Sequence, residues 1–237
     1  MPIHPQLPLG LRLQDNARFE NFHAGPHAEL VRVLRQCAAG DGEPSLYIWG
    51  PPGTGKSHLL QAVCRDAEHS GSRVAYLPLA ELSAWPPDII EGLEQMDLVC
   101  ADDVEAIAGR RDWEEALFHL FNRLRGNGGR LVAAGARRPG EVGLALADLV
   151  SRLSWGPVYP LSGLDDENRL QALQLRARRF GLELPAETAR YLLRRYPRDL
   201  AALFGLLDRL DREALAAQRR LTVPFVKAVL EGRENGD

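Results

Sequence analysis

A glycine-rich segment in the first quarter of the chain has the residues and spacing needed to bind phosphate. The motif G-x-x-x-x-G-K-[ST] is matched without a gap by Gly50, Pro51, Pro52, Gly53, Thr54, Gly55, Lys56 and Ser57. Glycines let backbone N–H groups converge on phosphate oxygens, and the start of a helix adds partial positive charge. We expect Lys56 to reach the β- and γ-phosphates and Ser57 to bind Mg²⁺. The alternative is a Gly/Pro turn without a ligand.

A pair of carboxylates follows an apolar run further along the chain. Residues 98–101 (LVCA) are followed by Asp102 and Asp103. A strand there would place both carboxylates at the C-terminal edge of a parallel sheet, where ligands bind. We expect Asp102 to hold Mg²⁺ through water and Asp103 to orient or deprotonate an attacking water. Two such residues alone are usually a solvated turn or a helix cap, but the loop described above favours the functional interpretation.

Short apolar runs alternate with helical patterns over the first two thirds of the chain. Strands are predicted at 45–49, 73–77, 98–101 and 130–134, and a fifth within 157–161. Helices are predicted at 27–39, 57–68, 79–84, 88–95 and 113–125. In the helix at 113–125, one face carries Trp113, Leu117, Leu120, Phe121 and Leu124. This alternation indicates an α/β fold, a parallel five-stranded sheet flanked by helices on both faces.

The last third of the chain has no strand pattern. Helices are predicted at 165–180, 185–194, 198–218 and 222–231, and the composition changes at 161–164. We therefore expect three parts, namely an extended tail at 1–18, an α/β nucleotide-binding domain at 19–161 and an all-α domain at 162–237.

Composition excludes several classes of protein. The 237 residues carry a net charge of −3, which argues against a protein that coats DNA or an anionic membrane. No apolar run approaches the ~18 residues of a membrane helix, and the first residues lack the pattern of a signal peptide. The three cysteines show no metal-binding spacing and are expected to be buried thiols in a reducing compartment. We expect a cytoplasmic protein.

Several motifs, in order along the chain, resemble the AAA+ ATPases, and among them the family of the bacterial replication initiator DnaA. Residues 19–22 (FENF) with Gly25 resemble the segment before the nucleotide site, and 151–156 (SRLSWG) resemble the motif that carries an arginine finger. Residues 196–200 (YPRDL) resemble the second sensor motif at the start of a lid helix. The resemblance implies a P-loop AAA+ module with a C-terminal lid that binds ADP or ATP with Mg²⁺. Arg198 would lie over the phosphates, and His58 would either touch a phosphate or simply pack.

The two ends of the chain differ from the initiator. We expect no helix-turn-helix domain after Glu231. Residues 6–11 (QLPLGL) resemble the short peptide by which proteins dock on the polymerase sliding clamp. Gln6 offers a hydrogen-bond donor and an acceptor, and Leu7, Leu9 and Leu11 can enter an apolar groove. The alternative is a leader whose leucines dock on their own domain. The combination resembles those members of the family that inactivate DnaA.

The resemblance implies a negative regulator of replication initiation, associated with the replisome and the nucleoid. It would dock on the DNA-loaded clamp, contact DNA indirectly through it, and supply Arg152 in trans to ATP-bound DnaA to stimulate hydrolysis there. The alternative for Arg152 is a structural ion pair. Gly135 and Ala136 stand where the family usually has a polar residue, so we expect weak intrinsic ATP turnover.

Two other functions fit the same sequence. One is an autonomous ATPase such as a helicase loader or a transposition helper, and the other is an adaptor that binds DNA directly. Self-assembly into a homo-oligomer is compatible with the sequence, and no membrane partner is expected.

Overall fold

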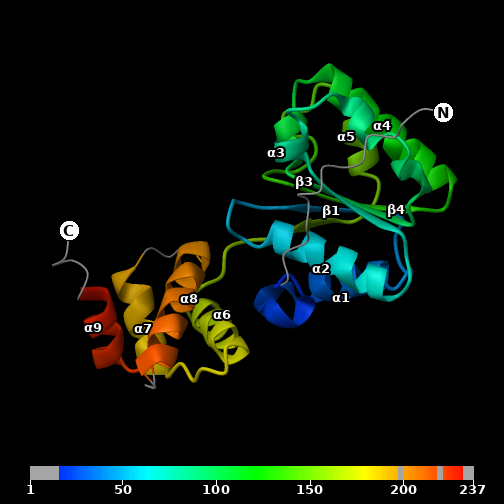
Figure 1. Cartoon of the computed structure of the whole chain (residues 1–237). Coiled ribbons are helices and arrows are strands. Elements are labelled where there is room, and N and C mark those ends of the chain that lie inside the picture. Colours follow the sequence, from blue (N-terminus) through cyan, green and yellow to red (C-terminus); the bar gives the residue numbers. More distant parts are fainter. Residues whose placement is uncertain (1–15, 197–199, 218–220, 232–237) are drawn as a thin grey trace. The chain divides into compact units, whose positions relative to one another are not determined.

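The computed structural model describes residues 16–196, 200–217 and 221–231 (Figure 1). Its contacts divide the chain into two compact units, each with a core of its own. Among the described residues, the first unit contains 16–19 and Pro26–Ser162, and the second contains Glu20–Gly25 and those from Gly163 onward.

The first unit is built on a five-stranded sheet in which every strand pair is parallel. The strands are β1 (Ser45–Trp49), β2 (Val74–Pro78), β3 (Leu98–Asp102), β4 (Arg130–Gly135) and β5 (Val158–Pro160), in the spatial order β2-β3-β4-β1-β5. All five residues of β3 are buried, as expected for a central parallel strand covered on both faces. The predicted parallel five-stranded sheet is confirmed.

Helices cover both faces of this sheet. Figure 1 shows α1 (Ala28–Ala38) and α2 (Lys56–His69) on one face, and α3 (Leu79–Leu82), α4 (Arg111–Gly126) and α5 (Ala147–Leu153) on the other. Short 3₁₀ turns lie at Phe19–Asn21, Gly25–His27, Pro87–Ile90, Leu93–Gln95 and Val104–Ile107. The predicted apolar face of α4 is confirmed, because all five of its members are buried in the core. Each such side chain contributes about 1.5–3 kcal/mol when removed from water.

One helical prediction in this unit was wrong, and one helix was not predicted. The segment predicted as one helix at 88–95 is two 3₁₀ turns, because Gly92 between them has φ +86° and interrupts the helical backbone. The helix α5 was not predicted at all. Its seven residues are too few for a clear apolar period.

The second unit is all-helical, as predicted. It consists of α6 (Asp166–Arg179), α7 (Ala186–Arg195), α8 (Leu200–Ala217) and α9 (Val223–Glu231), packed around a leucine-rich core. Asp165 caps α6 by accepting a 2.8 Å hydrogen bond from the Asn168 N–H. The Arg176 guanidinium joins α6 to α8 through a 2.8 Å contact with Asp208.

The segment Glu20–Gly25 belongs to the helical unit by its contacts. His23 Nε2 lies 2.9 Å from Asn168 Oδ1 on α6. A side chain at Gly25 would place its Cβ 2.5 Å from the same oxygen, so the close approach requires glycine. From the sequence, these six residues were expected in the nucleotide-binding domain.

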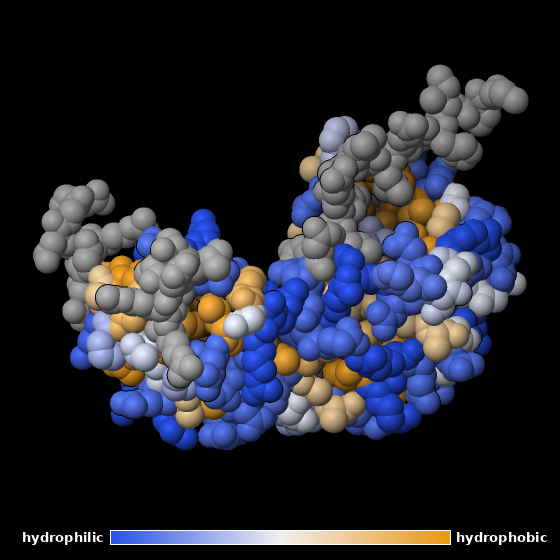
Figure 2. Space-filling model, turned by 60° about the horizontal axis from the view of Figure 1, so that its bottom comes forward, coloured by the Kyte–Doolittle hydropathy of each residue, from blue (hydrophilic) through white to orange (hydrophobic). Residues whose placement is uncertain are grey.

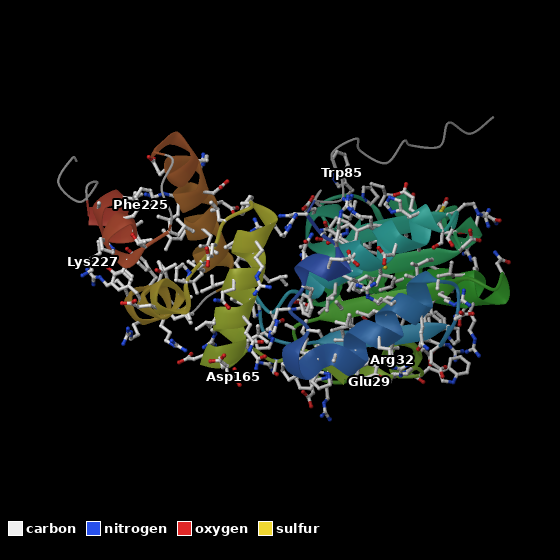
Figure 3. All side chains as sticks on the ribbon, turned by 90° about the horizontal axis from the view of Figure 1, so that it is seen from below. Glu29, Arg32, Trp85, Asp165, Phe225 and Lys227 are labelled. Carbon is white, nitrogen blue, oxygen red and sulfur yellow. The ribbon has the colours of Figure 1, made fainter. Side chains whose placement is uncertain are left out.

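Most of the described surface in Figure 2 is hydrophilic, with small hydrophobic areas between the charged side chains. The large hydrophobic side chains exposed in the described part of the chain are Trp85, Trp155 and Phe180; Figure 3 labels Trp85 at the surface. Among the described residues, no helix combines the length and the apolar character needed to cross a bilayer.

Candidate nucleotide-binding site

The predicted phosphate loop lies between β1 and α2, as the sequence indicated. Gly53 and Gly55 have φ of +77° and +99°, which only glycine adopts without strain, and Gly55 is the residue from which α2 starts. At Gly50 a Cβ would lie 2.0 Å from the Leu161 carbonyl oxygen. The loop therefore needs its glycines both to turn and to pass close to the neighbouring backbone.

Lys56 is buried and folds back over the loop. Its Nζ donates hydrogen bonds to the carbonyl oxygens of Gly50, at 2.7 Å, and Pro51, at 3.1 Å. Pro51, Pro52 and Gly53 are exposed, and so is Ser57 in the first turn of α2. The loop thus presents backbone N–H groups, a helix N-terminus and one ammonium group at a single place, an arrangement that suits a phosphate chain.

Asp102 ends β3 as a buried carboxylate held by two donors. The Tyr76 hydroxyl on the neighbouring strand β2 donates to Asp102 Oδ2 at 2.7 Å, and the N–H of Asp103 donates to Oδ1 at 3.1 Å. Tyr76 was not predicted from the sequence as part of the site. Burial and the adjacent Asp102 carboxylate raise the pKa of the Tyr76 phenol, so it stays protonated as a donor.

Asp103 leaves the strand in an unusual backbone conformation. Its φ is +55°, and no other non-glycine residue in the described ranges has a positive φ. Burial, followed by the charges of Asp102 and Glu105, raises the pKa of Asp103, and Lys56 opposes this shift. Asp103 and Lys56 therefore lie within electrostatic reach of each other. The two predicted motifs meet at the C-terminal edge of the sheet.

A third carboxylate, Glu105, lies beside the end of β4 and was also missed. Its Oε2 accepts a 3.0 Å hydrogen bond from the N–H of Ala136. The carbonyl of Gly135 in turn accepts a 3.2 Å hydrogen bond from the N–H of Gly50, the first residue of the loop. An acidic residue two positions after Asp103 was the only sequence signal for this group.

His58 lies on α2 directly after the loop. Its Nε2 is 2.9 Å from the carbonyl oxygen of Arg18. Of the two roles left open for His58, this contact favours packing against the N-terminal segment.

Arg152 lies on α5 and is half-buried. Its guanidinium carbon is 4.8 Å from the centre of the Trp155 ring and 5.9 Å from that of Phe118. Its Nε is buried and has no hydrogen-bond partner among the described residues, and none of the ion pairs in that part of the chain involves it. These contacts give no support to the alternative of a structural ion pair.

The remaining predicted site residues lie outside the described part of the chain. They are Gln6, Leu7, Leu9 and Leu11 of the clamp-like peptide and Arg198 of the second sensor motif.

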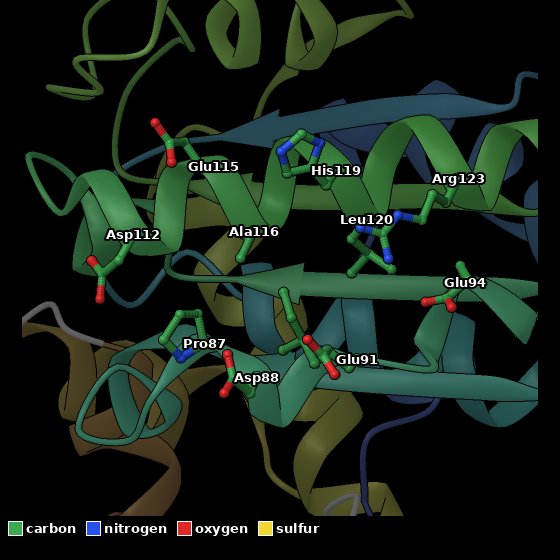
Figure 4. Close-up of a pocket in the computed structure, with 11 residues that line it drawn as sticks. Pro87, Asp88, Glu91, Glu94, Asp112, Glu115, Ala116, His119, Leu120 and Arg123 are labelled. Carbon is green, nitrogen blue, oxygen red and sulfur yellow. The ribbon is translucent and has the colours of Figure 1, made fainter.

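A cavity of about 250 Å³ opens between α4 and the turns at 87–95 (Figure 4). It is lined mainly by charged side chains, including Asp88, Glu91, Glu94, Asp112 and Glu115. None of its lining residues belongs to the phosphate loop or to the Asp102–Asp103 pair. Within the described ranges, no cluster of three His, Cys, Asp or Glu side chains is arranged to hold a metal ion.

The parallel sheet order, the phosphate loop and the helical C-terminal unit define an AAA+ module. Residues 13–159 match the family model described as the bacterial DnaA ATPase domain, and residues 166–230 match the model described as the lid domain of Hda. The chain belongs to the DnaA ATPase-domain family, with a lid of the Hda type.

Solved structures agree with this assignment. Domain III of the replication initiation protein DnaA from Thermotoga maritima is 25% identical, with a TM-score of 0.79 over 93% of this chain and 98% of that one. AMPPCP-bound DnaA from Aquifex aeolicus is 26% identical, with a TM-score of 0.71 over 84% of this chain and 66% of that one. The Holliday junction branch migration motor RuvB of T. maritima shares the fold. It is 18% identical, with a TM-score of 0.61 over 90% of this chain and 73% of that one.

Proposed function

We propose that this chain is a nucleotide-gated negative regulator of replication initiation. In its ADP-bound form it docks on the DNA-loaded sliding clamp in the cytoplasm and contacts DNA through the clamp. It then supplies Arg152 to ATP-bound DnaA, which hydrolyses its ATP. The observation that carries the proposal is the environment of Arg152, a cation stacked on an exposed tryptophan without an acidic partner among the described residues.

Nucleotide binding is supported by the loop at 50–57. Lys56 and the backbone N–H groups there suit the phosphates, and a DnaA relative has been solved with AMPPCP bound. The Ser57 hydroxyl and the Asp102 carboxylate are hard oxygen donors of the kind Mg²⁺ prefers, and Tyr76 holds Asp102 in one orientation. Mg²⁺ bound there would neutralise phosphate charge. Asp103 is the residue near Lys56 that can accept a proton from water.

The role of Arg152 follows from its charge and its surroundings. An arginine that is already paired with a carboxylate would have to lose that partner before it could meet a phosphate. Arg152 is instead held by ring faces, which fix the side chain and leave its charge available. An arginine supplied from a neighbouring chain stabilises the charge on a transferring phosphoryl group and is worth about 10³–10⁵ in rate in known GTPases.

Docking on the clamp rests on the sequence of residues 6–11 alone. Deleting residues 1–12 should abolish binding to the clamp and leave ADP binding unchanged. A full-length chain in which Gln6 and Leu9 are replaced by alanine controls for chain length and should lose clamp binding equally. Retained clamp affinity in both variants would contradict the docking proposal.

The main competitor is an autonomous ATPase. Neither Gly135 nor Ala136 has a side-chain group that can position an attacking water. ATP hydrolysis should therefore be slow with the purified chain alone, and should accelerate only when cognate ATP-bound DnaA and clamp-loaded DNA are present. The test compares phosphate release in the two mixtures, with ADP added or omitted. Vigorous turnover by the chain alone would favour the autonomous ATPase.

A further inference from the structure

We propose that Glu105 is a specificity-determining residue of the nucleotide site, which disfavours a nucleoside triphosphate relative to a diphosphate. This inference rests on the proposed binding of nucleotide at residues 50–57. It adds a residue for which neither the motifs nor the comparisons provide a role.

Glu105 is fixed close to the phosphate loop by the backbone. Glu105 Oε2 accepts the 3.0 Å hydrogen bond from the Ala136 N–H. The carbonyl oxygen of Gly135, the residue before Ala136, accepts the 3.2 Å hydrogen bond from the Gly50 N–H. Gly50 also accepts the 2.7 Å hydrogen bond from Lys56 Nζ. Three consecutive hydrogen bonds therefore connect the Glu105 carboxylate to the ammonium group expected to bind the phosphates.

The space after β4 is closed to other side chains. A Cβ at Gly135 would lie 2.2 Å from the Tyr47 hydroxyl and 3.2 Å from Glu105 Oε2. The Tyr47 hydroxyl is held in place, because it donates to the Arg137 carbonyl at 3.1 Å. Burial, and then the Glu105 charge, raise the pKa of Tyr47, as expected if the carboxylate lies nearby. The Glu105 carboxylate thus lies beside Gly135 and Ala136, which have no polar side chain of their own.

In the part of the chain that the structure describes, no ion pair neutralises the charge on Glu105. Asp102 and Asp103 lie at the same edge of the sheet, and the charge of Glu105 contributes to the raised pKa of Asp103. Lys56 is the one lysine of this unit, and its charge acts on Asp103, which the charges of Asp102 and Glu105 also reach. A γ-phosphate would add further negative charge there.

This arrangement predicts unequal effects on ADP and ATP. A carboxylate accepts hydrogen bonds but cannot donate one to a phosphate oxygen. We expect its repulsion to be larger for the triphosphate, because the γ-phosphate adds further negative charge to the site. The alternative role for Glu105, in orienting an attacking water, predicts a change in hydrolysis rate with no change in relative affinity.

The test measures the affinities of ADP and AMPPCP, both with Mg²⁺, for the full chain and for Glu105→Gln. Glutamine keeps an oxygen for the Ala136 N–H and removes the charge. The preference for ADP over AMPPCP should fall by on the order of fivefold. The matched control is Glu115→Gln, a partly exposed glutamate on α4 paired with Arg111, which should leave the preference unchanged.

A second measurement does not depend on a variant. Raising the salt concentration should weaken the discrimination between ADP and AMPPCP in the unmodified chain, because it screens exposed and half-buried charges.

An unchanged preference in Glu105→Gln, with or without altered hydrolysis, would overturn the role of Glu105 and leave nucleotide binding intact. Failure of the unmodified chain to bind either nucleotide would overturn the proposed function itself.

Discussion

The guanidinium of Arg152 lies 4.8 Å from the centre of the Trp155 ring, so its charge lies beside an exposed aromatic side chain. Trp155 is 55% exposed, and the Arg125 guanidinium lies 3.6 Å from the centre of the same ring. Two arginines therefore share one exposed aromatic side chain, forming a cationic group suited to meet an anionic partner.

Trp155→Ala should reduce the stimulation of DnaA without abolishing it. A cation–π contact at an exposed site is worth ~0.5–1 kcal/mol, so the loss should be about two- to fivefold. The measurement is the rate at which DnaA-bound ATP is hydrolysed in the presence of clamp-loaded DNA. Trp155→Phe should restore most of the rate, because it retains a ring face.

Trp85 provides the control for this experiment. It is 56% exposed, nearly as much as Trp155, and it lies in the segment between α3 and the turn at Pro87–Ile90. Trp85→Ala should leave stimulation unchanged. An equal loss in both tryptophan variants would show that the effect of Trp155 is not specific to Arg152.

The two lysines of the chain allow a matched test of the phosphate loop. Lys56→Ala should weaken binding of ADP at least about tenfold, because it removes a charge-assisted contact with phosphate. Lys227→Ala, on α9 (Figure 3), should leave ADP affinity unchanged. Equilibrium titration with a fluorescent ADP analogue measures the affinity of each variant for the nucleotide. Equal affinities in the two variants would show that the loop does not bind phosphate as proposed.

Glu114 should be important for stability although it carries no ion pair among the described residues. It is fully buried and accepts hydrogen bonds from the N–H groups of Gly109, Ala145 and Leu146, at 2.7, 3.1 and 2.6 Å. Glu114→Ala would leave these donors without a partner and should destabilise the fold by about 2–4 kcal/mol.

Denaturation in urea measures this loss. The neighbouring Glu115→Ala changes a partly exposed side chain and should cost less than about 1 kcal/mol. Similar free energies of unfolding for the two variants would contradict the role assigned to Glu114.

The contacts of Glu114 also explain why α5 could not be predicted from the sequence. The strands and α4 were predictable because their patterns are local, with short apolar runs beside turns and an apolar face repeating along one helix. The start of α5 depends instead on a carboxylate from α4, about 30 residues earlier, that bonds to Ala145 and Leu146. Sequence periodicity contains no information about such a contact.

The candidate site, like the fold, was predictable where the sequence pattern is local and not where it depends on distant contacts. Lys56, Asp102 and Asp103 belong to continuous motifs that follow strands, and the structure brings them to one edge of the sheet. Tyr76 and Glu105 reach that edge through strand pairing and through the positive φ of Asp103, which redirects the chain. Both depend on the three-dimensional arrangement of β2, β3 and β4, so the motifs did not reveal them.

The pair formed by Arg73 and Asp97 should make stability depend on pH. Hydrogen bonds from the Arg73 side chain and backbone lower the pKa of Asp97 to about 2, from the usual 3.8. Since the folded-state pKa is the lower one, the stabilisation is present above about pH 4 and is lost as the pH falls toward 2.

Asp97→Asn removes this contribution. The Arg73 side chain is exposed and the Asp97 side chain partly exposed, so solvent screening should keep the loss at neutral pH below about 1 kcal/mol. The difference from the unmodified chain should shrink between about pH 4 and pH 2 in denaturation experiments. A difference in the free energy of unfolding that stays constant with pH would mean that the Arg73–Asp97 contact stabilises the fold independently of the carboxylate charge.

The most direct test of the proposed function is a single-turnover assay of ATP bound to cognate DnaA, with clamp-loaded DNA, ADP and either the unmodified chain or Arg152→Ala. The variant should fold, bind ADP and bind the clamp as before, but stimulation should fall by about 10³-fold or to the unstimulated rate. Arg111→Ala, which removes an exposed arginine paired with Glu115, should behave like the unmodified chain. Undiminished stimulation by Arg152→Ala would contradict the account.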